Sequence, residues 1–290
     1  MIHYTAFLQV LEHNSFSLAA RAMGYTQSAV SQMVKSLEEE LGVTLLLRSR
    51  AGVTLTREGE ALLPFIRDVT QAHRKLSDQA AAVRGLEQGV VRIGSFNSVS
   101  SSLLPQAIKR FREAHPSIRF ELHQGLYQEL ESWVREGVVD FSFTDLYRPT
   151  EFETRQLYRD SLLAVLPAEH RLAALEVVPV EELALEPFIL LDEGRGGATL
   201  NEFLAEHPKL DVQYRVADDY SILNMVANRL GVAVLPEIVA RKAPEGVAVR
   251  ALDPPLRRSM GVIFRRQAGL STAAQVFLDV LGGVIREQGL

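Results

Sequence analysis

Polar side chains of the kinds that bond base edges and phosphates cluster between residues 26 and 50. Glutamine, serine and lysine can exchange hydrogen bonds with the edges of base pairs, and arginine neutralises phosphates. The candidates for such contacts are Thr26, Gln27, Ser28, Ser31, Gln32, Lys35, Arg48 and Arg50. They predict a nucleic-acid contact surface, provided that local structure presents them on one side.

The spacing of apolar residues predicts an amphipathic helix that carries most of these side chains. Apolar residues recur at i, i+4, i+7 and i+11, as Val30, Val34, Leu37 and Leu41. Thr26 is a suitable N-cap for this helix, and Gly42 is a suitable end. The polar candidates then face away from the apolar stripe, toward solvent.

A shorter helix precedes this one, and a hairpin follows it. The first helix can start at Ser15 or Ser17 and end at Gly24. Its expected apolar face consists of Leu18, Ala19 and Ala22. The hairpin pairs residues 45–48 with 53–55 around Ala51-Gly52, which places both arginine candidates near its tip.

This window resembles the winged helix-turn-helix of the LysR-type transcriptional regulators. The matching residues are Phe7, Ser15-Phe16-Ser17, Ala19-Ala20, Thr26-Gln27-Ser28, Val30-Ser31, Leu37-Glu38, Leu41-Gly42, Arg48, Leu55-Thr56 and Gly59. Leu47 stands where the family usually has phenylalanine, which is a packing change. Length and downstream layout also fit, so the resemblance covers the whole chain. It implies a regulator with double-stranded promoter DNA and a small-molecule effector as partners, and it leaves RNA polymerase open as a third.

Residues 59–89 predict a linker helix that pairs with a second copy. Thr56 can cap it, and it can run to about Gly85 or Gly89. Its apolar seam has heptad spacing and consists of Leu62, Ile66, Val69, His73, Leu76, Ala80 and Val83. Pro64 inside it should kink the helix or break a turn. The resemblance implies antiparallel dimer pairing through this helix and a homotetramer built as a dimer of dimers.

Residues 90–290 alternate between strand and helix patterns, which predicts parallel sheets with crossover helices. Strands are expected at 90–95, 118–125, 139–145, 162–167, 186–194, 212–218, 232–237 and 260–266. Helices are expected at 103–115, 128–137, 201–208, 220–231 and 272–288. The pattern resembles the two-lobed periplasmic-binding-protein fold, with lobe I at about 90–164 and 263–290 and lobe II at about 165–262. The predicted fold class is therefore α+β and α/β, with the DNA-binding domain at 1–58.

Ligands of open α/β sheets bind beyond the carboxyl ends of the strands. The residues expected there are Ser98, Ser100, Ser101, Tyr127, Thr144, Arg148, Thr199 and Asp218. The serines precede a helix, where free backbone N–H groups favour anions. Three loop arginines, Arg148, Arg195 and Arg257, could bind a carboxylate. These residues together favour a small organic anion, such as a di- or tricarboxylate, as the effector.

Composition restricts the remaining classes. The chain has no cysteine, which excludes disulfides and a thiol-based peroxide sensor. Its seven histidines show no metal-ligand spacing, and no catalytic constellation or cofactor motif is evident. No signal segment or membrane-spanning run is evident either, so a cytoplasmic location is expected. The alternatives are a small-molecule binding protein without a DNA role, and an enzyme-like domain fused to a DNA-binding head.

The net charge of −5 does not by itself suggest a nucleic-acid binder. Residues 1–90 hold nine Lys/Arg and nine Asp/Glu, so all five excess negative charges lie in residues 91–290. The positive charge of the first part is concentrated at Lys35 and the hairpin. Affinity for DNA must then come from local placement and from several copies, which favours an oligomer.

Overall fold

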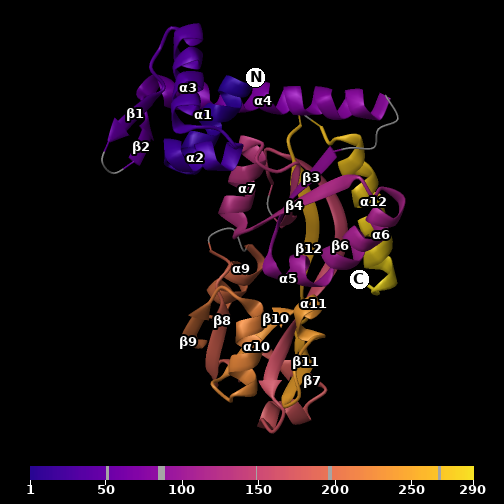
Figure 1. Cartoon of the computed structure of the whole chain (residues 1–290). Helices are drawn as coiled ribbons and strands as arrows, with labels where there is room; N and C mark the ends of the chain where they lie inside the picture. The colour runs from indigo at the N-terminus through magenta and orange to yellow at the C-terminus, as the bar shows by residue number, and fades with distance from the viewer. Residues whose placement is uncertain (50–51, 84–88, 148, 195–197, 267–268) are drawn as a thin grey trace. The chain divides into compact units, whose positions relative to one another are not determined.

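The computed structural model describes residues 1–49, 52–83, 89–147, 149–194, 198–266 and 269–290 (Figure 1). They form two compact units, Met1–Leu86 and Glu87–Leu290. Within the described ranges, no helix is both long enough and apolar enough to cross a bilayer.

The N-terminal unit contains three short helices, a two-stranded hairpin and one long helix. In chain order these are α1 (Ile2–Glu12), α2 (Phe16–Met23), α3 (Gln27–Leu41), β1 (Leu46–Ser49), β2 (Gly52–Leu55) and α4 (Arg57–Val83). The strands are antiparallel, with Leu46 opposite Leu55. This arrangement is the predicted winged helix-turn-helix followed by a long helix.

The predicted caps position α2 and α3. Ser15 accepts a hydrogen bond from the Leu18 N–H, and Thr26 accepts one from the Ala29 N–H. Gly24 has a φ of 72°, in the left-handed region that favours glycine. The turn between the two helices is therefore determined by local sequence.

The predicted apolar face of α2 is wrong for two of its three residues. Leu18 is 49% exposed and Ala22 is also exposed, whereas Phe16, Ala19 and Ala20 are buried. The buried three are spaced i, i+3 and i+4, so they share one side of the helix. The predicted face leaves out Phe16, whose large aromatic ring lies on the buried side of the helix.

Helix α4 runs continuously through Pro64, so the expected break of a turn is absent. Thr56 caps it as predicted, because its side chain accepts a hydrogen bond of 2.8 Å from the Gly59 N–H. Pro64 is exposed, so water can reach the carbonyl that loses its helical partner. The helix cannot extend to Gly89, because that residue begins the next strand.

Lobe I of the second unit is built on three parallel strands with Ile93 at their centre. Ile93 pairs with Leu122 on one side and with Phe141 on the other. In chain order, the elements from residue 89 to residue 145 are β3 (Gly89–Ser95), α5 (Asn97–Ser102), α6 (Leu104–Ala114), β4 (Ile118–Gln124), α7 (Tyr127–Glu136) and β5 (Phe141–Asp145). The C-terminal helix α12 (Thr272–Glu287) lies beside α6 in Figure 1, and Phe277 on α12 contacts Phe111 on α6.

Two long antiparallel strands connect the lobes. They are β6 (Glu153–Pro167) and β12 (Leu256–Phe264), paired from Leu256 opposite Leu162 to Phe264 opposite Glu153. Strand β6 begins nine residues before the predicted start at residue 162. Its first part reads ETRQLYRDS, and the many polar side chains there obscure the strand pattern.

Lobe II places β10 against both β6 and the parallel strand β8, and β9 lies beyond β8. Strands β7 and β11 were not predicted; β11 also pairs with β6. The elements are η1 (Arg171–Ala174), β7 (Val177–Pro179), α8 (Val180–Leu183), β8 (Pro187–Leu191), α9 (Ala198–Glu206), β9 (Asp211–Val216), α10 (Asp219–Ala227), β10 (Val232–Pro236), α11 (Glu237–Ala240) and β11 (Val247–Asp253). The two-lobed fold that the sequence predicted is therefore present.

Candidate functional site

Helix α3 presents the predicted polar face. Val30, Val34 and Leu37 are at most 1% exposed and form the inner face. Ser31 is half-buried, and the other polar candidates are exposed: Thr26, Gln27, Ser28, Gln32 and Lys35. Lys35 forms an exposed i,i+4 ion pair with Glu39 at 3.4 Å. Such a pair is weak in water, so the ammonium group stays available to a stronger anion.

The hairpin arginine is held against α2 and α3. Arg48 donates a hydrogen bond of 2.8 Å to the Ser31 hydroxyl, and its guanidinium lies 3.8 Å from the centre of the Phe16 ring. Both contacts fix an exposed cation beside the polar face of α3. Arg50, the other hairpin candidate, lies outside the described residues.

Two residues that sequence reasoning missed position the hairpin. The Glu38 carboxylate accepts hydrogen bonds from the Leu45 and Leu46 N–H groups at 2.7 and 3.2 Å. The Asn14 side chain accepts one of 2.7 Å from the Val53 N–H. Asn14 and Val53 are 39 residues apart in the sequence, so no local sequence pattern predicts the bond between them. Together these bonds fix the hairpin relative to the helices.

The second unit contains a cavity of about 250 Å³ between its lobes. Lobe I contributes the start of α5 and the segment from β4 to α7. Lobe II contributes the end of β8 and the segment after it, and the segment between β9 and the start of α10. The lining residues are Phe96, Asn97, Ser98, Gln124, Gly125, Leu126, Glu129, Leu191, Glu193, Ala217 and Asp219. The cavity therefore lies beyond the carboxyl ends of parallel strands from both lobes, which is where the sequence placed the cleft.

Of the three predicted serines, only Ser98 lines this cavity. The hydroxyl of Ser100 lies 2.6 Å from that of Ser95 and donates to the Phe96 carbonyl at 2.9 Å. Ser101 donates to the Asn97 side chain at 3.1 Å. The hydroxyls of Ser100 and Ser101 thus stabilise the start of α5.

None of the other effector candidates that the structure describes is a lining residue of the cavity. Asp218 caps α10 and accepts a hydrogen bond of 2.5 Å from Asn97 of lobe I. Thr199 is buried and donates to the Asp145 carboxylate, so this pair also joins the lobes. Thr144 and Tyr127 are buried as well. Arg148 and Arg195 lie outside the described residues.

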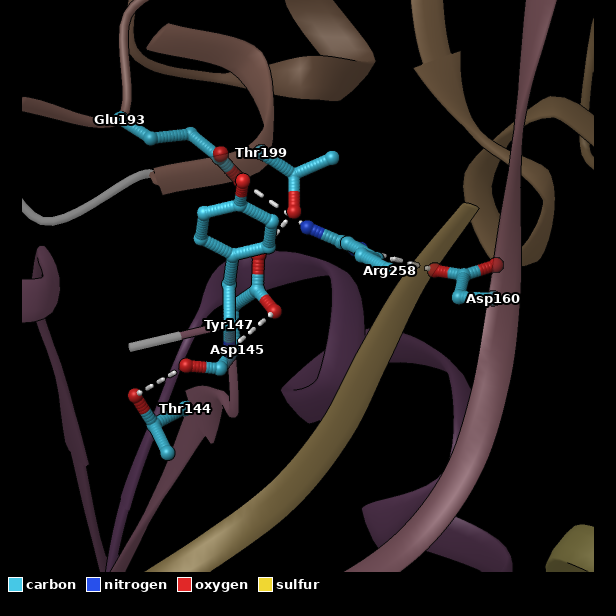
Figure 2. Close-up of polar contacts among 7 residues, drawn as sticks. All are labelled: Thr144, Asp145, Tyr147, Asp160, Glu193, Thr199 and Arg258. Carbon is cyan, nitrogen blue, oxygen red and sulfur yellow. Dashed lines mark hydrogen bonds and ion pairs between the residues drawn. The ribbon is translucent and has the colours of Figure 1, made fainter. Parts of the chain in front are cut away.

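A buried arginine joins the crossing strands to lobe II (Figure 2). Arg258 is 4% exposed; it donates to Asp160 on the neighbouring strand at 3.0 and 3.2 Å, and to Glu193 at 3.1 Å. Burial raises the pKa of Asp160, and the Arg258 guanidinium opposes that rise. The cluster connects β12, β6 and the segment that follows β8.

The sequence had pointed to the neighbouring Arg257, which is exposed and lies opposite Ser161 of β6. Arg258 is two residues before Met260, and both side chains are buried. The period-two pattern of a strand predicts this burial only where the strand includes residue 258. The predicted strand begins at residue 260 and therefore leaves Arg258 out.

The cavity wall is acidic. Glu129, Glu193 and Asp219 line it, and the described lining contains no lysine or arginine. Burial raises the pKa of the Glu193 carboxyl to about 7, and Arg258 opposes this effect. Burial likewise raises the pKa of Asp219 to about 6, and the charge of Asp218 adds to it. Burial therefore moves the pKa of both carboxyls toward neutral pH.

Comparison with known families identifies the two units. The family described as "Bacterial regulatory helix-turn-helix protein, lysR family" matches residues 2–60. The family described as "LysR substrate binding domain" matches residues 84–286. The chain belongs to the LysR family. LysR-type proteins are transcriptional regulators with a DNA-binding and an effector-binding domain, and they are not enzymes.

Curated relatives agree along the whole chain. The probable HTH-type transcriptional regulator LrrA of Synechococcus elongatus is 34% identical over 274 residues, which cover 94% of this chain and 92% of the relative. The uncharacterized HTH-type transcriptional regulator YvbU of Bacillus subtilis is 31% identical over 277 residues, 94% of each chain. Both support the assignment of a LysR-type regulator.

Solved structures share the fold. A full-length variant of OxyR from Pseudomonas aeruginosa superposes with a TM-score of 0.75 at 24% identity, over 98% of this chain and 93% of that one. Full-length CbnR in complex with its target DNA gives 0.64 at 18% identity, over 97% of this chain and 98% of that one. At these identities the likeness concerns the fold alone.

Proposed function

We propose that this LysR-type regulator reads promoter DNA with the polar face of α3, and that a small molecule between the lobes controls it. The observation that carries the DNA part is the side of α3 opposite Val30, Val34 and Leu37, with Arg48 fixed beside it. Glutamine and serine on such a helix fit base edges in a major groove. Arg48, and Arg50 in the hairpin tip, supply charge for the phosphate backbone.

The test is binding to the DNA upstream of the regulator's own gene, measured by mobility shift and footprinting at fixed salt. Gln32→Ala should lower the preference for this DNA over a random sequence by about 1–3 kcal/mol, because a base contact is lost. Gln275→Ala, an exposed glutamine on α12, is the matched control and should bind normally. Equal site preference in the Gln32 variant and the wild type would remove Gln32 from the proposed DNA contacts.

The same proposal includes a dimer made through α4. Leu62 and Ile66 of the predicted seam pack against the core of their own unit, whereas Val69 is 46% and Leu76 is 68% exposed. Phe65, beside the seam, is 66% exposed. Such apolar side chains on one helix favour a partner helix. Pairing of these dimers into a tetramer is the further expectation from the family.

Leu76→Glu should break this assembly without unfolding the monomer, because the side chain is exposed. Two linked DNA readers gain affinity over one by roughly 10²–10⁴-fold, so specific DNA binding should fall by that order. Light scattering measures the assembly and mobility shift measures the binding. Leu185→Glu, at a 72% exposed position in lobe II, is the matched control. A wild-type protein that is monomeric at micromolar concentration contradicts the proposal.

The nature of the effector is the least constrained part. The sequence favoured a small organic anion, on the strength of its serines and loop arginines. Among the described residues, Ser98 is the one predicted serine in the cavity wall, and that wall is acidic. The coarse proposal is therefore a small polar effector, and the small organic anion that the sequence favoured is its finer form. A regulator that binds chromosomal DNA acts in the cytoplasm, which is the location we propose.

A further inference from the structure

The loop between α1 and α2 carries a residue with an unusual backbone conformation. Asn14 has a φ of 48°, in the left-handed region that asparagine tolerates better than most other side chains. Its N–H donates to the Leu11 carbonyl at 3.2 Å, and the N–H of Ser15 donates to the Val10 carbonyl at 3.3 Å. These bonds fix the loop to the end of α1, so the side chain of Asn14 starts from a defined position.

The side chain of Asn14 lies against two adjacent residues of β2. Its carboxamide oxygen accepts a hydrogen bond of 2.7 Å from the Val53 N–H. Gly52 has a φ of 123°, and a Cβ added to it would lie 2.5 Å from that oxygen and 2.8 Å from the carboxamide carbon. Both the backbone conformation and the neighbouring side chain therefore favour glycine at position 52. We call the contact of Asn14 with Gly52 and Val53 the hairpin clip.

The hairpin clip holds the second end of a residue pair whose first end is already attached. Val53 lies opposite Arg48 in the antiparallel hairpin. Arg48 is held by the Ser31 hydroxyl of α3 and by the Phe16 ring of α2, and Val53 is held by Asn14. A two-stranded hairpin is at best marginally stable in water by itself. The orientation of this hairpin therefore depends on its contacts with the helices and with the loop before α2.

We propose that Asn14 is a positioning residue for DNA binding, which holds the hairpin in the orientation that contacts DNA. A segment that is ordered before binding loses less conformational entropy on binding, so its contacts contribute more to affinity. The hairpin clip orders β2 and thereby supports Arg48 on the paired strand, which supplies charge for the phosphate backbone. Asn14 acts through the hairpin and contacts no DNA itself. This inference rests on the proposed DNA-binding function and adds a residue that lies outside both α3 and the hairpin.

Asn14→Gly tests the inference, because glycine keeps the left-handed backbone and removes the carboxamide. In the full-length protein the Val53 amide should exchange its hydrogen faster than in the wild type, whereas the amides of α3 should not change. Affinity for the DNA upstream of the regulator's own gene should fall about fivefold, which corresponds to the loss of one hydrogen bond. Affinity for a random sequence should fall equally, because α3 keeps its polar face. Arg229→Gly is the matched control, since Arg229 of lobe II also has a left-handed φ, of 62°, and this variant should bind DNA normally.

Gly52→Ala tests the same contact from its other side. The added Cβ would displace the carboxamide of Asn14, so DNA affinity should fall by at least as much as in Asn14→Gly. In the double variant, Asn14→Gly should cause no further loss, because both changes break one contact. Circular dichroism of each variant reports whether it folds, and Asn14→Gly decides the matter alone if Gly52→Ala does not fold.

Three results overturn the inference: wild-type DNA affinity in Asn14→Gly, unchanged exchange of the Val53 amide in that variant, and additive losses of affinity in the double variant. Additive losses would mean that Asn14 affects DNA binding independently of the hairpin. In each case the wild type still binds its DNA, so the proposed regulator stands. Absence of specific DNA binding in the wild type is the separate result that would contradict the proposed function.

Discussion

Arg48 and Arg258 show how differently the two units use the same side chain. Arg48 is exposed, donates one hydrogen bond to Ser31 and lies over the ring of Phe16. Arg258 is buried and donates to Asp160 on β6 and to Glu193 in the segment that follows β8. The first arginine stays available to an outside partner, whereas the second is part of the interior.

The difference in exposure determines whether each arginine affects mainly binding or mainly the stability of its unit. An exposed charge stays hydrated, so its removal changes the stability of the fold little and changes binding directly. A buried charge has lost its water, and removing its partner leaves an uncompensated ion in the interior. We therefore expect DNA affinity in the first unit to be separable from stability, and ligand response in the second unit to be coupled to it.

Arg258→Ala tests the buried side of this comparison and should have the largest effect. Loss of the guanidinium leaves Asp160 and Glu193 without their counter-charge, which should destabilise the second unit by about 3–5 kcal/mol. Hydrogen exchange of the amides in β6 and β12 measures this loss. The same experiment on amides of α3 should show no change.

Arg48→Ala is the matched control for that variant. Because the side chain is exposed, its removal should change stability by less than about 0.5 kcal/mol. DNA affinity should fall for all sequences alike, with a salt slope smaller by about one unit. A stability loss of equal size in both variants would contradict the comparison.

The pH dependence of stability is the next effect in size. The pKa of Glu193 is raised from 4.5 to about 7, so between these values the folded protein holds a proton that the unfolded chain releases. Stability of the second unit should then fall as the pH rises through this window, by up to about 3 kcal/mol. The raised pKa of Asp219 acts in the same direction.

Glu193→Gln should remove most of this dependence while it keeps an oxygen for Arg258. The charged and titratable groups that act on Glu193 are Arg258 on β12, Asp145 at the end of β5, Asp219 on α10 and Tyr127 on α7. Hydrogen exchange of β6 and β12 at pH 5 and pH 8 measures the effect in variant and wild type. Identical slopes in the two proteins would show that Glu193 does not titrate in this range.

How far the sequence predicts this molecule depends on how local each feature is. The caps at Thr26 and Thr56 and the turn at Gly24 depend on residues within a few positions, and all three were predicted correctly. Ser15, the observed cap of α2, was one of the two candidates. The alternation of strands and helices in the second unit is equally local. The early start of β6 and the short strand β7 were missed because their composition is polar or their length small.

The cavity depends on distant contacts, and prediction was weaker there. The location of the cavity was predicted from the rule that ligands bind beyond the carboxyl ends of strands. Most of its lining residues were not predicted. Arg258 meets Glu193 across 65 residues and Asp160 across 98. The spacing of residues in the sequence does not predict contacts between positions so far apart. The polarity of the wall is thus a tertiary property, and the sequence pattern of serines and arginines did not predict its acidic residues.

The smallest predicted effect concerns the contact between Ser31 and Arg48. If Ser31 acts in DNA binding mainly by holding Arg48, then Ser31→Ala should lower DNA affinity only while Arg48 is present. Ser31→Ala should cost about 1 kcal/mol in affinity for all DNA sequences, the usual size for one hydrogen bond. In the double variant it should cost nothing further, because the arginine it holds is gone. A double-mutant cycle of DNA affinities at one salt concentration measures this coupling. Additive losses of affinity, together with a change of sequence preference in Ser31→Ala alone, would instead show that Ser31 contacts a base edge. Ser31 and Arg48 would then make two independent DNA contacts rather than one coupled pair.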